Sequence, residues 1–524
     1  MREMKRFFLI AALSLASVCL ACAKGAEGGS KPTDYQVSVS GRVTCQGQPV
    51  ADAVVSDGIE IVRTDADGRY SLFSPGRMGY VFITVPSGYK VANKGVLPGH
   101  YVNIKGKKAE HADFELLPMP DKTYTLFVMS DVHLIGNATH RDLEQFRSTF
   151  LPDITAAVEA TSGEVFSLSL GDMTTDSRWY HDNFALPEYL REFRTYPSAI
   201  YHIMGNHDND PEACGTTDEE LDRSASAPYR KYIGPTYYSL NIGDVHYVML
   251  DNIVGMGKCK YKYYIDPVQL AWLEKDLALV DKSTPIIVSM HVPAYAYAGI
   301  SDGKPTVKKR TTQYQDVQVL IDLLEPFAEV HILTGHDHRN RNIRITDRIL
   351  EHNFASASAI SWKLNDVRVM TTDGTLSGYQ LFRIDGKNVR WQYKAVGLTP
   401  EKSQFRTYDL NTVPEAYGGK PSSNELLINV FNWDPRWTVS VTENGRELLV
   451  RQLWAKDPLY AYIRDKTRAF DNRPKDWRAV NCIHLFGAKA ASADSEIVVT
   501  VTDRFGQVYT EKLERPKTFE EGMN

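Results

Sequence analysis

The sequence predicts an α/β domain flanked by two mainly β domains. Five apolar runs of strand character lie in the middle of the chain, mostly separated by helix-like segments, and they span residues 126–129, 165–170, 199–204, 286–290 and 330–333. Strand, loop, helix and strand in succession are typical of an α/β sheet. Short alternating runs punctuated by glycine occur on both sides of this region. They predict a small all-β sandwich before it and a mainly β domain after it.

Length and charge limit the possible architectures and partners. The chain has 524 residues, more than one hydrophobic core usually supports, so about two to four domains are expected. The net charge is −5, with acidic and basic residues interspersed, and this offers no basic surface for a phosphate backbone. The sequence therefore predicts no nucleic-acid partner, and it does not predict the oligomeric state.

The N-terminus has the pattern of an export signal. Basic residues precede an apolar run at 7–20 that is too short to span a bilayer comfortably. Two processing routes are open: cleavage after small residues, or acylation at Cys22, because residues 20–22 resemble a bacterial lipoprotein box. We expect a signal peptide at 1–22, a flexible tether at 23–34, and a location in the periplasm or at the cell surface. The expected membrane contact is a lipid anchor at Cys22.

The unit at 35–118 is expected to be an independent β-sandwich. It contains the alternating run 37–43 and turn signals at Asp57-Gly58 and Asp67-Gly68. These segments resemble the transthyretin-like sandwich of carboxypeptidase regulatory domains. His100 is expected at its surface. Because this unit has its own alternating strands, a chain starting near Pro118 is predicted to retain activity.

Helices and connections follow in order. Helix-like segments are expected at 141–150 and 152–159, separated by Pro152. Asp266 as N-cap and Pro267 in the first turn begin another helix, and a fourth at 316–325 ends before a proline. Residues 237–252 predict a hairpin turning at 242–244. The stretches 209–235 and 294–315 are expected to be irregular walls of a pocket.

Two features have alternative interpretations, the basic cluster at 304–310 and a pair of cysteines, and a third concerns the C-terminal part of the chain. The basic cluster Lys304, Lys308, Lys309 and Arg310 could attract an anionic substrate or form a solvated face. Cys214 and Cys259 could form a disulfide or remain two free thiols. Proline, glycine and polar residues at 400–423 predict a linker before a C-terminal β domain at 424–516, which has a hairpin turn at Asn444-Gly445.

Polar residues follow each of the five central strands. They are Asp131-Val132-His133, Gly171-Asp172, Gly205-Asn206-His207-Asp208, His291 and Gly335-His336-Asp337-His338. Ligands of α/β sheets gather beyond the carboxyl ends of the strands, so these groups are expected to converge. A second Asp-x-His at residues 244–246 is set aside because it begins in a turn. Asp-x-His and His-x-His place both side chains on one side of an extended backbone.

The order of these motifs resembles the calcineurin-like metallophosphoesterase family, and the match defines a catalytic domain at 119–399. The resemblance implies a sandwich of two mixed sheets flanked by helices, in an exported bacterial branch with β domains on both sides. It also implies two divalent cations, with Mn, Fe, Zn or Mg possible. By resemblance, Asp131, His133 and His338 hold the first cation, Asn206, His291 and His336 hold the second, and Asp172 bridges them.

The implied reaction is hydrolysis of a small phosphate ester, either a monoester or a diester. The cations would supply a bridging hydroxide as nucleophile and neutralise phosphoryl charge, and His207 would act as general acid. Asp176 and Asp208 are both candidates to orient His207. Purple acid phosphatases carry a tyrosine at the position of Thr175, so no charge-transfer ligand is expected here. The alternative function is a surface glycan- or partner-binding protein with a vestigial metal site.

Overall fold

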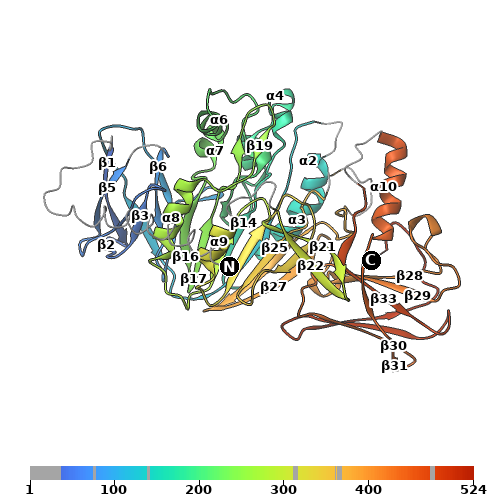
Figure 1. Cartoon of the computed structure of the whole chain (residues 1–524). Coiled ribbons are helices and arrows are strands. Elements are labelled where there is room, and N and C mark those ends of the chain that lie inside the picture. Colours follow the sequence, from blue (N-terminus) through green and yellow to red (C-terminus); the bar gives the residue numbers. More distant parts are fainter. Residues whose placement is uncertain are drawn as a thin grey trace, which may run out of the picture.

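The computed structural model describes residues 37–74, 78–137, 142–310, 317–359, 362, 369–471 and 478–523. Figure 1 shows a β domain at each end of the molecule and a domain of sheets and helices between them. The signal peptide, the tether and Cys22 lie outside the described residues. Within the described part, no helix has both the length and the apolar character needed to cross a membrane.

The N-terminal domain is a sandwich of two sheets. One is built around β1 (Val37–Cys45), which pairs with β2 (Gln48–Pro49), β5 (Arg69–Ser74), β11 (Ala109–His111) and β12 (Phe114–Pro118), and β12 also pairs with β7 (Tyr89–Val91). The other has the order β10 (Tyr101–Asn103), β6 (Tyr80–Thr84), β3 (Val54–Ser56) and β4 (Ile61–Arg63). Exposed and buried residues alternate along β5, as expected for a strand with one face on a core.

The first sheet of the central domain combines parallel and antiparallel strands. Its order is β15 (Ile200–His202), β14 (Glu164–Ser169), β13 (Thr123–Met129), β26 (Gly378–Asp385) and β27 (Asn388–Ala395). The strands β13, β14 and β15 are parallel, whereas β26 pairs antiparallel with both β13 and β27. Both faces of β13 are covered, because Leu126 and Val128 belong to one buried cluster and Phe127 and Met129 to another.

The second sheet packs against the first. Its order is β16 (Tyr238–Ile242), β17 (Val245–Met249), β20 (Ile286–Ser289), β23 (Val330–Thr334), β25 (Ile349–Asn353) and β24 (Arg341–Arg344). The four inner strands are parallel, and the edge strands are antiparallel. Val288 and Ile332 share a core cluster with Leu126 and Val128. The expected sandwich of two mixed sheets and the expected hairpin at 237–252 are confirmed.

Helices cover the outer faces of the sandwich. The helix α8 (Pro267–Leu277) begins at Asp266, whose side chain accepts a hydrogen bond from the Val268 N–H, and α9 (Val317–Leu324) precedes β23. Helix α2 (Asp142–Gln145), the π-helical turn η2 (Phe146–Phe150) and α3 (Leu151–Glu159) are continuous in sequence. The predicted break at Pro152 is therefore wrong. The proline lies in the first turn of α3, directly after the wider π-helical turn, where its missing N–H is tolerated.

The two stretches expected to be irregular contain regular structure. Residues 209–235 include α6 (Asp218–Ala225) and α7 (Ala227–Tyr232), and residues 294–315 include the hairpin β21 (Tyr295–Ser301) and β22 (Lys304–Lys309). Short elements of this kind contain too few residues to show a clear hydrophobic periodicity, so the sequence does not predict them. A second small hairpin, β18 (Val254–Gly255) and β19 (Tyr261–Lys262), lies next to α6.

The C-terminal domain begins earlier than predicted. The segment 400–423 contains β28 (Phe405–Asp409), which forms a sheet with β29 (Glu425–Val430), β33 (Cys482–Lys489) and β32 (Arg451–Ala455). The prediction of a linker there is wrong, because Arg406, Thr407 and Tyr408 are fully buried despite the polar composition. The second sheet has the order β31 (Arg446–Glu447), β30 (Thr438–Glu443), β34 (Ile497–Thr502) and β35 (Val508–Leu513), and α10 (Pro458–Asp471) stands beside these sheets.

The N-terminal domain is not independent of the central domain. Phe82 of β6 packs edge-on against Trp272 of α8, with 5.9 Å between ring centroids. The Trp272 indole N–H donates to Ser56, and the Tyr237 hydroxyl donates to the Gly58 carbonyl at 2.7 Å. His100 is buried in the same interface and not at the surface as predicted. Alternation along strands indicates a buried face, but it does not identify the neighbouring surface.

Candidate metal centre

The predicted ligands lie at the carboxyl ends of five strands. Asp131 and His133 follow β13, Asp172 follows β14, Asn206 follows β15, His291 follows β20, and His336 and His338 follow β23. The loops remain paired beyond the strands, because the Asp131 N–H donates to the Gly171 carbonyl and the His133 N–H to the Asp172 carbonyl. The parallel arrangement thus brings ligands from distant parts of the sequence to one edge of the sandwich.

The backbone is left-handed at five of the seven predicted ligands. The φ angles are 54° at Asp131, 47° at His133, 51° at Asp172, 67° at His336 and 51° at His338. The expected extended backbone is therefore absent at both the Asp-x-His and His-x-His motifs. Non-glycine residues in this conformation are uncommon and cluster at functional sites, where the surrounding structure holds them.

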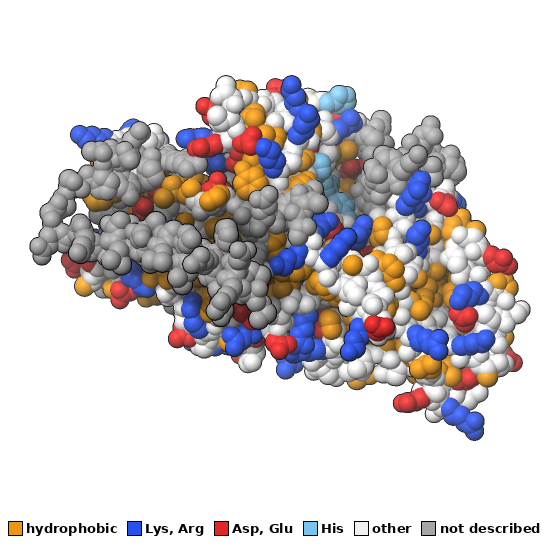
Figure 2. Space-filling model, in the orientation of Figure 1, with side chains coloured by type: hydrophobic (Ala, Val, Ile, Leu, Met, Phe, Trp, Pro, Cys, Tyr) orange, Lys and Arg blue, Asp and Glu red, His pale blue; other side chains and the backbone are white. Residues whose placement is uncertain are grey.

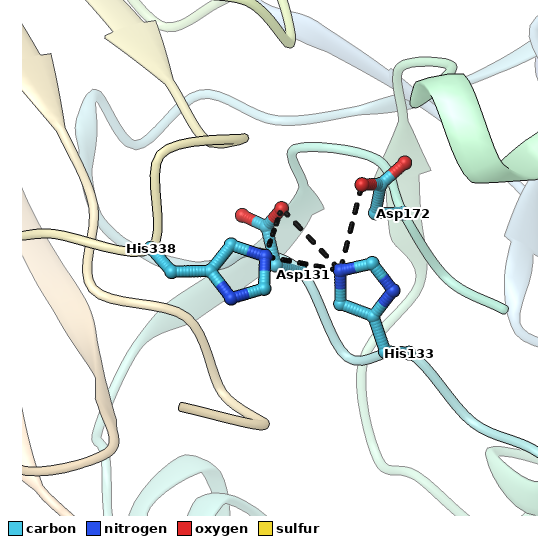
Figure 3. A group of neighbouring side chains, drawn as sticks. All are labelled: Asp131, His133, Asp172 and His338. Atoms are coloured by element: carbon cyan, nitrogen blue, oxygen red, sulfur yellow. Dashed lines mark hydrogen bonds and ion pairs between the residues drawn. The ribbon is translucent and has the colours of Figure 1, made fainter. Parts of the chain in front are cut away.

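One group of four side chains can hold a first cation. Asp131, His133, Asp172 and His338 each offer a ligand atom, and these atoms lie within 4.8 Å of one another. Figure 3 shows ring nitrogens of His133 and His338 facing each other, and the two Nε2 atoms are 3.0 Å apart. The His338 Nε2 lies 3.3 Å from Asp131 Oδ1, and the His133 Nε2 lies 3.5 Å from Asp172 Oδ2.

A second group shares one residue with the first. Asp172, His291 and His336 also place ligand atoms within 4.8 Å of one another. The His291 Nε2 is 3.2 Å from Asp172 Oδ2, and Asn206 Oδ1 is 2.9 Å from the Nδ1 of His336. Asp172 is thus positioned to bridge two cations, with Asn206 beside the second group.

The donor set fits metal ions. The Nδ1 atoms of His291 and His338 donate to the carbonyls of Leu170 and Ala359, at 2.7 and 2.5 Å, so in the neutral ring each Nε2 carries the lone pair that a cation needs. The His291 Nε2 is fully buried and has no hydrogen-bond partner among the described residues. A buried polar atom without a hydrogen bond is costly, and a cation would satisfy it. Carboxylate, imidazole and amide ligands suit the divalent metals expected from the sequence.

The buried carboxylates and imidazoles strongly shift one another's pKa values. Burial alone would raise the pKa of Asp172, but the neighbouring His291 and His207 hold it well below its usual range. Burial would lower the pKa of His291, but Asp172 and Asp131 raise it to about 10. Burial lowers the pKa of His133 to about 3. Cations would replace the proton on His291 and compensate the carboxylate charge.

His207 lies beside the ligands and is oriented by Asp176. Its Nδ1 is 2.8 Å from Asp176 Oδ1, and its backbone N–H donates to Asp172 Oδ1 at 2.7 Å. One third of the side chain is exposed, whereas Asp176 is buried. Burial lowers the pKa of His207, but Asp172 and Asp176 outweigh this effect and raise it to about 9.

Asp208, the other candidate to orient His207, instead binds backbone N–H groups of the neighbouring loops. It accepts hydrogen bonds from the backbone N–H groups of Gly205, Met173 and Thr174, at 2.9, 2.9 and 3.3 Å. Its carboxylate therefore braces the loops after β14 and β15 against each other. Burial, followed by the nearby Asp172, raises the pKa of Asp208 to about 8.

Other sequence candidates lie apart from this centre or at its margin. His246 of the second Asp-x-His is buried between Asn241 and Asp276, at 2.9 Å from each. Of the basic cluster, the lysines stand on the hairpin β21–β22, and Arg310 donates to Asp337 at 2.7 Å. Cys214 and Cys259 are free thiols.

Figure 2 shows histidine side chains in a hollow of the central domain, with lysine and arginine side chains nearby. Two tyrosines at this site have no counterpart among the sequence candidates. The Tyr261 hydroxyl donates to Asp176 Oδ2, and the Tyr263 ring lies 5.3 Å from the ring of His336. No motif marks them, because they reach the site from a small hairpin far from the ligands in the sequence.

Three family models match the chain in order and together cover most of it. They are described as the N terminal of calcineurin-like phosphoesterase (residues 37–119), calcineurin-like phosphoesterase (residues 124–340) and the C terminal of calcineurin-like phosphoesterase (residues 351–509). The central match contains every predicted metal ligand.

Two curated relatives come from Arabidopsis thaliana. Purple acid phosphatase 23 is 27% identical over 256 residues, which cover 44% of this chain and 50% of the relative. Purple acid phosphatase 15 is 28% identical over 144 residues, which cover 26% of this chain and 24% of the relative. The chain thus spans half or less of these relatives.

Two solved structures are also similar in part. A dimetal phosphatase from Danio rerio has 13% sequence identity and a TM-score of 0.36, with coverage of 52% of this chain and 96% of that chain. The purple acid phosphatase PPD1 from yellow lupin has 12% identity and a TM-score of 0.35, with coverage of 66% and 67%.

Proposed function

The chain belongs to the calcineurin-like phosphoesterase family, and from this premise we propose that it hydrolyses phosphate esters with two divalent cations. The observation that carries the proposal is the pair of ligand groups that share Asp172. A carboxylate common to two adjacent sites is suited to hold two cations close together. The substrate is proposed to be a small phosphomonoester or phosphodiester.

The protein's own groups define how a phosphate ester would be held. Asp131, His133 and His338 would hold one cation, Asn206, His291 and His336 would hold the other, and Asp172 would bridge them. When bound, the cations would activate water and neutralise charge on the phosphoryl oxygens. The Nδ1 atoms of His291 and His338 are fixed by backbone carbonyls, so the ligating Nε2 atoms are preoriented.

We assign His207 the role of general acid. Its Nδ1–H is directed at Asp176. Burial lowers the pKa of His207, but Asp172 and Asp176 raise it to about 9, so near neutral pH the ring carries a second proton on Nε2. The ring also lies 5.2 Å from the ring of His133, which places it beside the first ligand group. A proton carried on Nε2 would pass to the departing oxygen of the ester.

A phosphoester panel combined with metal analysis tests the function. The mature protein should contain two metal ions per chain and should turn over at least one class of phosphomonoester or phosphodiester. Both measurements are made on the same sample. A protein that holds two metals but hydrolyses no ester would contradict the proposed activity and favour the binding-protein alternative.

A leaving-group series tests the role of His207. The penalty for His207→Ala in kcat/KM should approach about 10²- to 10⁴-fold for an alkyl ester, because an alkoxide needs a proton to leave. The penalty should shrink for nitrophenyl esters, whose leaving groups are stable anions. An equal penalty across the series would assign His207 to charge stabilisation instead.

We further propose that the protein acts outside the cytoplasm, at the periplasmic side of a membrane or at the cell surface. The proposal rests on the basic residues before the apolar run at 7–20 and on Cys22, which follows that run. Fractionation of cells expressing wild type and Cys22→Ser tests it. Wild type should sediment with membranes and the variant should not, and equal soluble fractions would exclude the lipid anchor.

A further inference from the structure

Tyr261 connects a small hairpin to the orienting carboxylate. Its hydroxyl donates to Asp176 Oδ2, whereas Asp176 Oδ1 accepts from the Ser177 N–H at 2.7 Å and lies 2.8 Å from His207 Nδ1. Both oxygens of this buried carboxylate are thus engaged. The Tyr261 ring also stands edge-on to the His207 ring, with 5.9 Å between centroids and 76° between planes.

The hairpin that carries Tyr261 is held at its turn and on its second strand. The Lys258 N–H donates to the Pro211 carbonyl at 2.7 Å, and Lys262 forms an ion pair with Asp218 of α6. Three consecutive residues from Gly257 have φ angles of 66°, 53° and 53°. Two of them are not glycine, and such a conformation persists only where neighbouring contacts enforce it.

We propose that Tyr261 is a positioning residue for the general acid and that it acts on His207 through Asp176. The inference rests on the proposed function. The terminal torsion of an aspartate has a broad energy profile, so one engaged oxygen does not fix the plane of the carboxylate. The phenolic O–H supplies the second fixed contact. It thereby directs Asp176 Oδ1 at His207 Nδ1 and fixes the His207 ring beside the first ligand group.

This role differs from simple packing in a measurable way. Tyr261→Phe keeps the ring beside His207 and removes only the hydroxyl. If Tyr261 acts through His207, kcat/KM should fall about tenfold for an alkyl ester and much less for a nitrophenyl ester. In a His207→Ala background, Tyr261→Phe should cause no further loss, because its effect passes through the missing imidazole.

Tyr264→Phe is the matched control. It removes a phenol three residues along the same segment, and Tyr264 lines a cavity near Asp218 and Asp222, away from Asp176. We expect wild-type kinetics on every ester. Metal content and the thermal midpoint of each variant are measured on the same samples, so a loss of fold or of metal is detected directly.

A second variant tests the link itself. Asp176→Asn should give a loss with the same dependence on the leaving group, also without addition in the His207→Ala background. A uniform loss across the series for Tyr261→Phe or Asp176→Asn, or an equal further loss in the His207→Ala background, would overturn the positioning role. If metal-loaded wild type hydrolyses no ester, this inference fails together with the proposed function, whereas active wild type isolates the role of Tyr261.

Discussion

At the scale of single residues, Asp172 organises the metal centre. Its Oδ2 lies 3.5 Å from His133 Nε2 and 3.2 Å from His291 Nε2, which belong to different ligand groups. Its Oδ1 accepts the backbone N–H of His207. One carboxylate therefore determines the relative position of both groups and of the proposed general acid.

Asp172→Asn should abolish turnover and lower the content of both metals, because the amide removes the negative charge shared by two cations. The shape of the side chain is conserved, so the fold should survive. Activity assays, metal analysis and circular dichroism on one preparation check this expectation. Retention of more than about a tenth of wild-type activity would contradict the bridging role.

His336→Ala and His338→Ala should each deplete one metal more than the other. The two histidines follow the same strand, but they contribute to different ligand groups. Metal analysis after dialysis against a weak chelator gives the comparison. The exposed His181 offers a control, since His181→Ala should retain both metals. Equal metal content in wild type and in both ligand variants would refute this division of the ligands.

At the scale of elements, the loops that follow the strands determine the geometry of the metal centre. Each of the loops after β13, β14 and β23 places at least one ligand in a left-handed conformation. Such residues cost about 1–3 kcal/mol each, so packing around them must compensate. Glycines next to the ligands allow this packing, because a Cβ at Gly205 would overlap the backbone and side chain of Asp172.

Gly205→Ala should disrupt the centre without violating backbone preferences. The φ angle of Gly205 is −97°, which alanine adopts freely, so any effect comes from the added methyl group. Displacement of Asp172 should lower kcat by about a hundredfold and should also reduce metal retention. Gly522→Ala is the control, because its Cβ would meet no atom within 4 Å. Wild-type kinetics of Gly205→Ala would disprove the close contact.

At the scale of the whole molecule, one buried apolar cluster runs through all three domains. It includes Val39 and Phe82 of the N-terminal domain, Trp272 and Val288 of the central domain, and Ile428 of the C-terminal domain. The domains therefore stabilise one another, and the boundary near residue 118 is not a point where the chain can be divided freely.

A chain starting at Pro118 should be poorly soluble and thermally unstable, in contrast to the prediction from the sequence. Removal of the N-terminal domain would expose Trp272, Tyr237 and Tyr238, which are buried in the whole chain. The milder change Trp272→Ala should cost about 3–5 kcal/mol of unfolding free energy. Denaturant titration measures the stability of the truncated chain and of the Trp272→Ala variant. A truncated chain with the wild-type midpoint would contradict the shared core.

The interface between these domains should weaken in acid. Burial lowers the pKa of His100 to about 3, and its ring packs 4.4 Å from the ring of Tyr238. Below about pH 6.5 His100 therefore binds a proton in the unfolded state but not in the folded state. As the pH decreases below this value, the free energy of unfolding decreases by about 1.4 kcal/mol per pH unit. His100→Phe should lose less stability than wild type between pH 7 and pH 5. Parallel stability curves for the two proteins would disprove the contribution of His100.

The sequence by itself determined the strands of the central sandwich and the residues that follow them. Apolar runs that are buried on both faces are recognisable without a partner, and a polar motif directly after such a run must lie at the sheet edge. For this reason the positions of Asp131, Asp172 and His291 relative to the strands were predictable, as was the preference for Asp131 over Asp244.

Only the tertiary structure decided which groups touch. The choice of Asp176 over Asp208, and the contact of Tyr261 with Asp176 across 85 residues, depend on how separate loops pack. The burial of His100 and the strand β28 within the supposed linker depend on surfaces supplied by other segments. Periodicity and composition report whether a residue is buried, whereas the identity of its neighbours is fixed by packing between distant parts of the chain.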